Sequence, residues 1–183
     1  MKATKTREAV TIRLATAEDL EPLVRMYVSF EPKLEFQGLP PANEERIRRW
    51  LEPLLRAPNS HLIIETDTGR IVGHAMLCQQ SSERAELAIF VHQDYRHHGL
   101  GEKLMQAIVR FACQCLHLRK IWLTVELLNA PAVNLYQKLG FVPIYEQGVL
   151  SSELIMEREV SCQVCRQQQC PVFEAHIPLR IEL

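Results

Sequence analysis

Six consecutive residues, 96–101, have the types and the spacing that are needed to bind a phosphate group. They follow an apolar run at residues 87–91 and precede an amphipathic stretch that begins at Glu102. The start of a helix presents unpaired backbone N–H groups and the positive end of the helix dipole, and glycine lets a backbone come close to a phosphate. The pattern therefore predicts a pyrophosphate-binding loop, here called the cradle, which consists of Arg96, His97, His98, Gly99, Leu100 and Gly101.

The cradle alone does not identify a cofactor, because two glycines before a helix also form ordinary turns. The dinucleotide-binding fingerprint would need a third glycine where Leu104 stands. The Gly-Lys-Ser/Thr ending of a Walker A loop does not follow either. A second pattern further along the chain makes the interpretation more specific.

The second pattern is an apolar run at residues 121–126, followed by Asn129, a short predicted helix that carries Tyr136, and a Gly-Phe pair. An Arg-x-x-Gly-x-Gly loop after an apolar strand, followed by this second pattern, resembles the GNAT superfamily of acetyl-CoA-dependent N-acyltransferases. The resemblance covers about residues 10–158. It implies the GNAT fold, which is a mixed α/β sheet, and acetyl-CoA as the cosubstrate.

The resemblance also implies which residues bind the coenzyme. In this family the strand before the cradle separates from its neighbour, and its free backbone groups bind the pantetheine arm as an added strand would. This assigns the pantetheine arm to the backbone of Ile89, Phe90 and Val91, and the pyrophosphate to the cradle. We expect His97 and His98 to act there mainly through their backbone N–H groups.

Acetylation of an amine needs a group that protonates the departing thiolate, and Tyr136 is the predicted acid. The family commonly places a tyrosine here, near the coenzyme sulfur, and a phenol with a pKa of ~10 stays protonated at neutral pH. The alternative is that Tyr136 packs its helix against the core. Asn129 is expected to contact the coenzyme arm or to cap the helix that carries Tyr136.

The predicted base is Glu86, a carboxylate in a largely apolar strand. Burial there would raise its pKa toward the range in which it accepts a proton from an amine. The alternative is a charge at the exposed end of the strand, because Glu83 and Arg84 come just before it. Glu126, Glu65 or an ordered water are the other candidates for the base.

The elements that position these residues follow from the periodicity of apolar residues. Glu31-Pro32 should end the first helix, and Pro53 should kink or shorten the second. The predicted strands are 10–14, 61–66, 71–79, 85–91, 121–126, 141–145 and 153–157, and the predicted helices are 17–29, 43–55, 102–118 and 131–139.

Composition limits the classes of function. A chain of 183 residues with 47% hydrophobic and 23% charged residues fits one globular domain with a core. The net charge of −1 gives no overall attraction to nucleic acid or to a membrane surface. No apolar run is long enough to span a bilayer, and the basic N-terminus does not lead into a signal-peptide core. We therefore expect a cytoplasmic protein without nucleic-acid or membrane partners.

The six cysteines fall into two groups. Cys78, Cys113 and Cys115 lie in apolar context and are predicted to be small buried hydrophobic residues without disulfides. The other three lie in a predicted tail, 160–183, that follows a GNAT domain at 1–159. Three thiolates and one imidazole match a tetrahedral structural zinc site, whose ligands would be Cys162, Cys165, Cys170 and His176.

Two alternatives remain open for this tail. Cys162 and Cys165 could form a redox-active pair, or a last strand at residues 173–181 could dock on the domain with the cysteines incidental.

Together, these patterns predict an acetyl-CoA-dependent N-acetyltransferase that moves an acetyl group to a primary amine by direct transfer in a ternary complex. The alternative from another class is a non-catalytic acyl-CoA-binding module with a regulatory or interaction role. The acceptor, which is a small-molecule amine, a protein lysine or a protein N-terminus, is open. The oligomeric state is also open, and a homodimer is one alternative.

Overall fold

The structure is a computed structural model that describes residues 7–32, 40–56, 60–145, 151–160 and 176–182. The chain divides into two compact units, and each is described by itself. Unit 1 comprises residues 1–76, 89–107 and 174–183, and unit 2 comprises residues 77–88 and 108–173.

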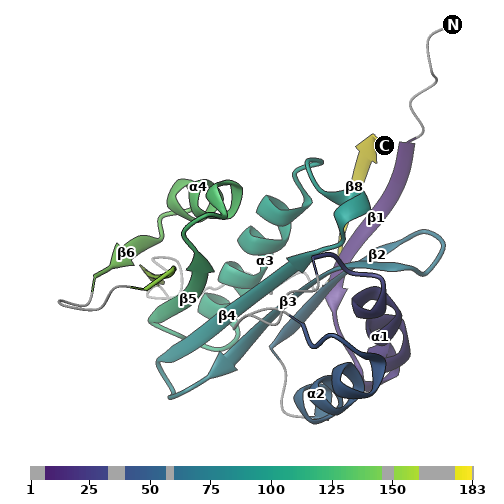
Figure 1. Cartoon of the computed structure of the whole chain (residues 1–183), viewed down its shortest axis with the longest axis horizontal. Coiled ribbons are helices and arrows are strands. Elements are labelled where there is room, and N and C mark those ends of the chain that lie inside the picture. Colours follow the sequence, from purple (N-terminus) through teal and green to yellow (C-terminus); the bar gives the residue numbers. More distant parts are fainter. Residues whose placement is uncertain (1–6, 33–39, 57–59, 146–150, 161–175, 183) are drawn as a thin grey trace, which may run out of the picture. The chain divides into compact units, whose positions relative to one another are not determined.

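Unit 1 is built on antiparallel strands with two helices packed against each other (Figure 1). Strand β1 pairs antiparallel with β2 on one side and with β8 on the other, and β2 pairs antiparallel with β3. The bounds of these elements are β1 (Arg7–Leu14), α1 (Leu20–Val28), α2 (Glu44–Arg56), β2 (His61–Thr66), β3 (Ile71–Gln79) and β8 (His176–Glu182).

An aromatic cluster fixes the helices of unit 1 on the strands. The Tyr27 ring lies 5.3 Å from the Trp50 ring and 5.4 Å from the Phe90 ring, measured between centroids, and both pairs are edge-to-face. Edge-to-face packing is a favoured geometry for aromatic pairs, which are worth ~0.5–1.5 kcal/mol beyond the area that they bury. Tyr27 lies in α1, Trp50 lies in α2 and Phe90 lies in β4 (Arg84–Val91), so the cluster joins all three elements.

Unit 2 is centred on a strand that has a partner on each side. Strand β5 pairs antiparallel with β7, which pairs antiparallel with β6, and the other edge of β5 pairs in parallel with the start of β4. This parallel ladder covers residues 84–86 of β4 and residues 120–122 of β5. The bounds are β4 (Arg84–Val91), β5 (Lys120–Glu126), α4 (Ala130–Lys138), β6 (Val142–Ile144) and β7 (Glu153–Glu159).

Strands β3 and β4 and helix α3 (Leu100–Gln114) run through both units. The strand order is β6-β7-β5-β4-β3-β2-β1-β8. Because β4 and β5 are parallel while the other recorded ladders are antiparallel, the sheet is mixed, as the sequence predicts. The mixed α/β fold is therefore confirmed. No helix in the described segments is long and apolar enough to cross a membrane.

Some elements differ in detail from the prediction. The first helix begins with a separate 3-10 turn, η1 (Ala17–Asp19), in which the Asp19 carboxylate accepts a hydrogen bond of 2.7 Å from the Thr16 backbone. Helix α2 continues past Pro53 to Arg56, so the proline does not end it. The C-terminal strand β8 confirms the alternative in which the last segment docks on the domain.

The prediction that three cysteines are buried is wrong, because none of the three is fully buried. Cys78 and Cys115 are exposed, and Cys113 has intermediate exposure. Cys78 lies where the buried run of β3 gives way to exposed residues, and Cys115 lies just beyond the end of α3. Apolar neighbours in the sequence therefore do not predict burial for residues near the end of a strand or a helix, where the chain reaches the surface.

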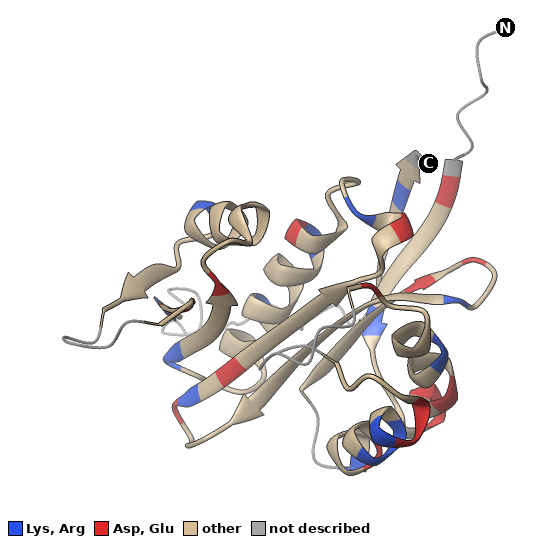
Figure 2. Cartoon of the chain, in the orientation of Figure 1, with Lys and Arg blue, Asp and Glu red and all other residues tan. Residues whose placement is uncertain are grey.

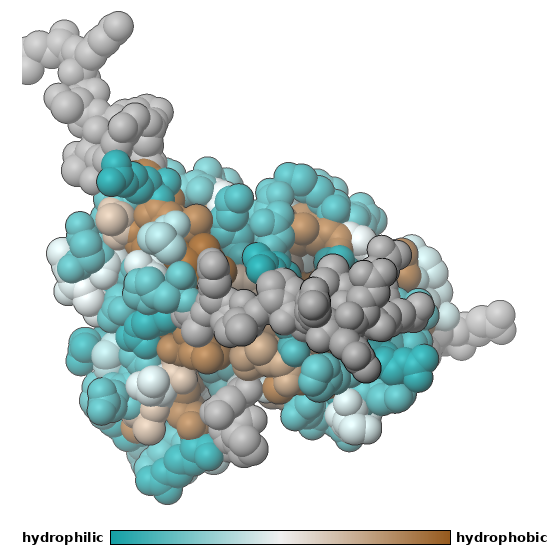
Figure 3. Space-filling model, turned by 180° about the vertical axis from the view of Figure 1, so that it is seen from behind, coloured by the Kyte–Doolittle hydropathy of each residue, from teal (hydrophilic) through white to brown (hydrophobic). Residues whose placement is uncertain are grey.

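Acidic and basic residues lie close together along the helices of unit 1, where red and blue segments alternate on the ribbon (Figure 2). Three ion pairs account for much of this pattern, namely Arg48 with Glu21, Arg49 with Glu45 and Arg56 with Glu52. Such exposed pairs contribute only ~0.2–1 kcal/mol each, so they indicate a solvated face rather than an acidic docking site. On the face seen in Figure 3, hydrophilic residues predominate and hydrophobic residues form smaller groups between them.

Candidate functional site

The cradle joins strand β4 to helix α3 through a backbone that turns sharply. It is preceded by a 3-10 turn, η2 (Gln93–Tyr95), and the φ angles of His97 and Gly99 are 66° and 74°. The left-handed region suits glycine but is uncommon for other residues, although histidine is enriched among the exceptions. Helix α3 begins at Leu100, two residues before the predicted start, so its first residues belong to the cradle. The predicted loop between strand and helix start is present.

Gly99 is needed for its conformation and not because neighbouring atoms crowd it. A Cβ atom added to Gly99 would meet no heavy atom within 4 Å. The space beside the glycine is therefore open at the N-terminus of α3, where the unpaired N–H groups of the first turn lie.

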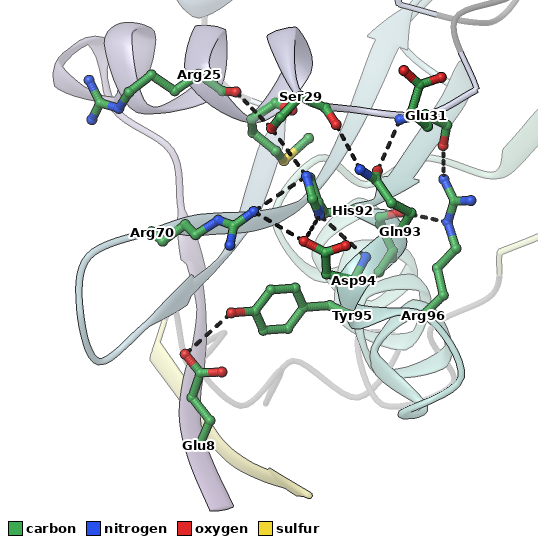
Figure 4. A network of polar contacts seen from close by, with 12 residues as sticks. Glu8, Arg25, Ser29, Glu31, Arg70, His92, Gln93, Asp94, Tyr95 and Arg96 are labelled. Carbon is green, nitrogen blue, oxygen red and sulfur yellow. Dashed lines mark hydrogen bonds and ion pairs between the residues drawn. The ribbon is translucent and has the colours of Figure 1, made fainter. Parts of the chain in front are cut away.

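Arg96 braces the cradle from within unit 1 (Figure 4). Its Nε donates a 3.0 Å hydrogen bond to the Val91 carbonyl, and another guanidinium nitrogen donates to the Glu31 carbonyl. The guanidinium also lies 5.2 Å from the centroid of the Phe30 ring, and burial lowers the pKa of Arg96. The side chain thus ties the end of β4 to the segment after α1. The backbone N–H groups at the start of α3 are the expected donors to a phosphate.

His92 is a site residue that sequence reasoning missed. Its side chain is 1% exposed, and its Nε2 lies 3.1 Å from the Ser29 hydroxyl and 3.4 Å from an Arg70 nitrogen. Its Nδ1 lies 3.4 Å from the backbone N–H of Asp94, which it caps (Figure 4). Burial is the main cause that lowers the pKa of His92. The residue holds η2, and hence the entry to the cradle, against α1 and the β2–β3 turn.

In the sequence, no signal marks His92. It is one of several polar residues that follow a predicted strand, and its partners Ser29 and Arg70 are more than twenty positions away.

Gln93 adds two further bonds to this junction. Its side-chain nitrogen donates a 2.7 Å bond to the Ser29 carbonyl, and its side-chain oxygen accepts a 2.9 Å bond from the Glu31 backbone.

In unit 2, Tyr136 lies on α4 and is 8% exposed. Its ring lies 6.1 Å from that of Phe141, centroid to centroid, and burial raises the pKa of Tyr136 to about 12. The phenol is therefore protonated at neutral pH. Its packing also agrees with the alternative structural role.

Asn129 caps the same helix. Its side-chain oxygen accepts a 3.3 Å hydrogen bond from the Ala132 backbone, and Pro131 occupies the first turn. This confirms the capping role that the sequence suggested, while contact with the coenzyme arm stays a prediction.

Glu86 lies in the parallel ladder of unit 2, opposite Trp122. It has intermediate exposure, and burial raises its pKa as predicted. Its charge also contributes, after burial, to the raised pKa of the Cys78 thiol. The environment suits a base, although its role stays a prediction.

The alternates for the base differ in their partners. Both carboxylate oxygens of Glu65 accept hydrogen bonds from Arg13, at 2.7 and 3.1 Å. These bonds hold Glu65 on Arg13, away from the role of a free base. Glu126 is at the end of β5 with intermediate exposure, and it remains the more available alternate.

The residues predicted to bind the coenzyme and to catalyse the reaction do not all belong to the same unit. Ile89, Phe90, Val91 and the cradle belong to unit 1, while Glu86, Asn129 and Tyr136 belong to unit 2. The parallel ladder between β4 and β5 ends at Glu86 and Trp122, before the predicted pantetheine-binding residues.

The predicted zinc ligands are only partly described. Cys162, Cys165 and Cys170 lie outside the described residues, and His176 is an exposed residue at the start of β8, in register with Arg13. The described residues contain no group of three or more metal-ligating side chains. The structure thus lends the zinc site no support.

Comparison with known proteins decides the family. A profile of the acetyltransferase (GNAT) family matches residues 20–141, about two thirds of the chain. The chain belongs to this family. The expectation of an acetyl-CoA-dependent N-acetyltransferase, made from the cradle and the second pattern, is thereby confirmed.

Similar proteins carry related names. This GNAT chain is 26% identical over 136 residues to the L-amino acid N-acetyltransferase AaaT of Escherichia coli, which covers 72% of this chain and 82% of that protein. It is 33% identical over 132 residues to the amino-acid acetyltransferase of Pasteurella multocida, over 72% of this chain but only 27% of that protein. A GNAT acetyltransferase structure from Streptococcus pneumoniae superposes with a TM-score of 0.66 and 25% identity, covering 83% of this chain and 99% of that one.

Proposed function

We propose that this GNAT protein transfers the acetyl group of acetyl-CoA directly to the primary amine of a free amino acid, within a ternary complex. The observation that carries the coenzyme assignment is the cradle, where a left-handed Gly99 precedes the first turn of α3 and has open space beside it. The names of the two relatives support an amino acid as the acceptor. The cytoplasm is the proposed location.

The residues of the chain have distinct parts in this proposal. The cradle's backbone N–H groups bind the pyrophosphate, and the backbone of residues 89–91 binds the pantetheine arm. Glu86 accepts a proton from the ammonium or the attacking amine, directly or through one water. The amine nitrogen then bonds to the thioester carbon, the carbon–sulfur bond breaks, and Tyr136 donates its proton to the departing thiolate.

An acceptor screen tests the proposal. Purified full-length protein is incubated with acetyl-CoA and released thiol is measured over free amino acids, polyamines, lysine-containing peptides and peptide N-termini. We expect amino acids to give the highest kcat/KM. Faster turnover of polyamines or peptides would contradict the proposed acceptor. Tight acetyl-CoA binding without thiol release for any amine would instead favour the non-catalytic module.

A structural zinc ion held by Cys162, Cys165, Cys170 and His176 remains a separate prediction. Metal analysis of the reduced, purified protein tests it. A zinc content of zero, together with a melting temperature that a chelator leaves unchanged, would rule it out.

A further inference from the structure

A pocket lies in unit 1, apart from the cradle. It has a volume of about 370 Å³ and lies between helix α1 and the β2–β3 turn. Arg25, Met26 and Ser29 line it from the helix, and Thr68 and Arg70 line it from the turn. None of the lining residues belongs to the cradle or to the predicted pantetheine strand. The volume suits a small organic molecule.

The charge of this pocket is one-sided. Among the described residues that line it there are two guanidinium groups and no carboxylate. Within the described part of the chain Arg25 forms no ion pair, because the nearby carboxylate of Glu21 is bonded to Arg48. Arg70 pairs with Asp94 only at 3.6 Å, and 48% of its side chain is exposed. Both cations can therefore accept an anionic partner.

The remaining lining residues indicate which chemical groups a ligand would have besides its negative charge. Pro22, Met26 and Ile71 offer apolar surface, and Ser29 and Thr68 offer hydroxyl groups. An apolar wall with a few polar groups typically orients a small molecule by one charged end. A free ammonium group would be repelled by Arg25 and Arg70 and would find no carboxylate in the lining.

We propose that this pocket binds a small organic carboxylate that has an apolar body and no ammonium group.

The pocket is connected to the cradle through the groups that it shares with the His92 network (Figure 4). Arg70 contacts both His92 and Asp94, and Ser29 contacts His92 from α1. A carboxylate that draws the Arg70 guanidinium into the pocket weakens its contact with Asp94 in η2, just before the cradle. Binding in the pocket therefore changes coenzyme affinity, and by linkage the coenzyme changes ligand affinity by the same factor.

If the proposed function holds, the ligand class includes the product of the reaction. Acetylation removes the ammonium charge of an amino acid and leaves its carboxylate, so the product has the charge that the pocket favours and the substrate does not. The binding site itself is argued from the pocket alone.

Isothermal titration of the coenzyme-free, full-length protein tests the site with three ligands that share one side chain. N-acetyl-L-leucine is an anion, L-leucine is a zwitterion and L-leucinamide is a cation at neutral pH. We expect N-acetyl-L-leucine to bind at least about 10-fold more tightly than L-leucine, and L-leucinamide not to bind. Arg25→Gln and Arg70→Gln should each weaken binding of N-acetyl-L-leucine by about 10-fold or more, and Arg25→Lys should restore part of it.

Arg49→Gln is the matched control, because Arg49 is an exposed arginine of unit 1 that is paired with Glu45 away from the pocket. It should bind N-acetyl-L-leucine as the unaltered protein does. Unchanged affinity in both pocket variants, or equal binding of L-leucinamide, would overturn the site. The titration contains no acetyl-CoA, so its result does not depend on whether the protein transfers acetyl groups. If the protein acetylates amino acids but does not bind N-acetyl-L-leucine in this way, the pocket proposal is wrong and the proposed function stands.

Discussion

At the scale of single residues, burial shifts the pKa values of both groups that are proposed to transfer protons, Tyr136 and Glu86. Burial disfavours the charged form of an acid, so it raises the pKa of the Tyr136 phenol to about 12 and raises the pKa of Glu86 as well. For Tyr136 this keeps the proton available until the thiolate forms. For Glu86 it makes the carboxylate a better acceptor of an amine proton.

Tyr136→Phe keeps the ring and its packing on Phe141 but removes the proton donor. We expect kcat to fall by about 10²-fold or more, with acetyl-CoA affinity nearly unchanged, because the donor acts on the leaving group in the transition state. Steady-state kinetics and calorimetry measure the two quantities. Tyr145→Phe is the control, since this tyrosine is 78% exposed. Turnover equal to that of the unaltered enzyme would show that another group protonates the thiolate.

Glu86→Gln keeps the shape of the side chain and removes its basicity. The unaltered enzyme should lose kcat/KM as pH falls through the raised pKa of Glu86, because protonation removes the base. In the variant kcat/KM should be lowest relative to the unaltered enzyme near pH 7, and the difference should shrink at high pH where free amine is abundant. Glu126→Gln is measured in parallel. If only Glu126→Gln changes the pH profile, the base is Glu126.

At the scale of elements, the cradle is positioned by side chains that come from outside its own segment. Arg96 reaches back to Val91 and Glu31, and His92 fixes η2 to Ser29 and Arg70. A loop held at both ends in this way can present its N–H groups without first being ordered by the ligand.

Gly99→Glu tests this loop. The new side chain has room but would place a carboxylate where the pyrophosphate is proposed to bind. We expect acetyl-CoA binding to be lost in calorimetry while the protein stays folded. Gly99→Ala is the matched control, because it has the same backbone strain at a φ of 74°, about 1–2 kcal/mol, without the charge. Equal coenzyme affinity in Gly99→Glu and Gly99→Ala would contradict the assignment.

The sequence predicted the parts of this element that depend on local pattern. Glycine spacing marks the loop and apolar periodicity marks the strand before it and the helix after it, because both signals lie within a few residues. The bracing role of Arg96 and the burial of His92 could not be predicted, since they depend on Glu31 and Ser29, just after α1, and on Arg70 in the β2–β3 turn. Docking of β8 beside β1 joins segments at opposite ends of the chain, so it remained only one of several alternatives.

At the scale of the whole molecule, a buried chain of polar groups joins α1, β3, β2 and α2 within unit 1. The Tyr27 hydroxyl lies 2.6 Å from Nδ1 of His74, whose Nε2 lies 3.0 Å from Nδ1 of His61. His61 also hydrogen-bonds to the Leu54 backbone. Every donor finds an acceptor when Tyr27 donates to His74, His74 donates to His61, and His61 donates to Leu54. This order requires both imidazoles to be neutral.

This buried chain predicts that the protein loses stability in mild acid. Burial, the largest cause, lowers the pKa of His61 to about 4 and that of His74 well below its usual value. The unfolded chain, with histidine pKa values of ~6.5, binds more protons than the native state below that pH. The free energy of unfolding is therefore highest above pH 6.5. Each imidazole should reduce it by up to ~1.4 kcal/mol per pH unit as pH falls from 6.5 toward 4.

Urea unfolding at pH 7.5, 6.0 and 5.0 measures this dependence. Asp19 does not confound it. Burial, the largest single cause, would raise the pKa of Asp19, but the hydrogen bonds from Arg13 and Thr16 and the charge of Arg13 together lower it. Its effect on stability therefore falls at more acidic pH than this range. Tyr27→Phe should cost about 1–3 kcal/mol at pH 7.5, because it leaves a buried imidazole nitrogen without its donor. An unfolding free energy that is equal at pH 7.5 and 5.0 would show that these histidines are not held neutral in the native state.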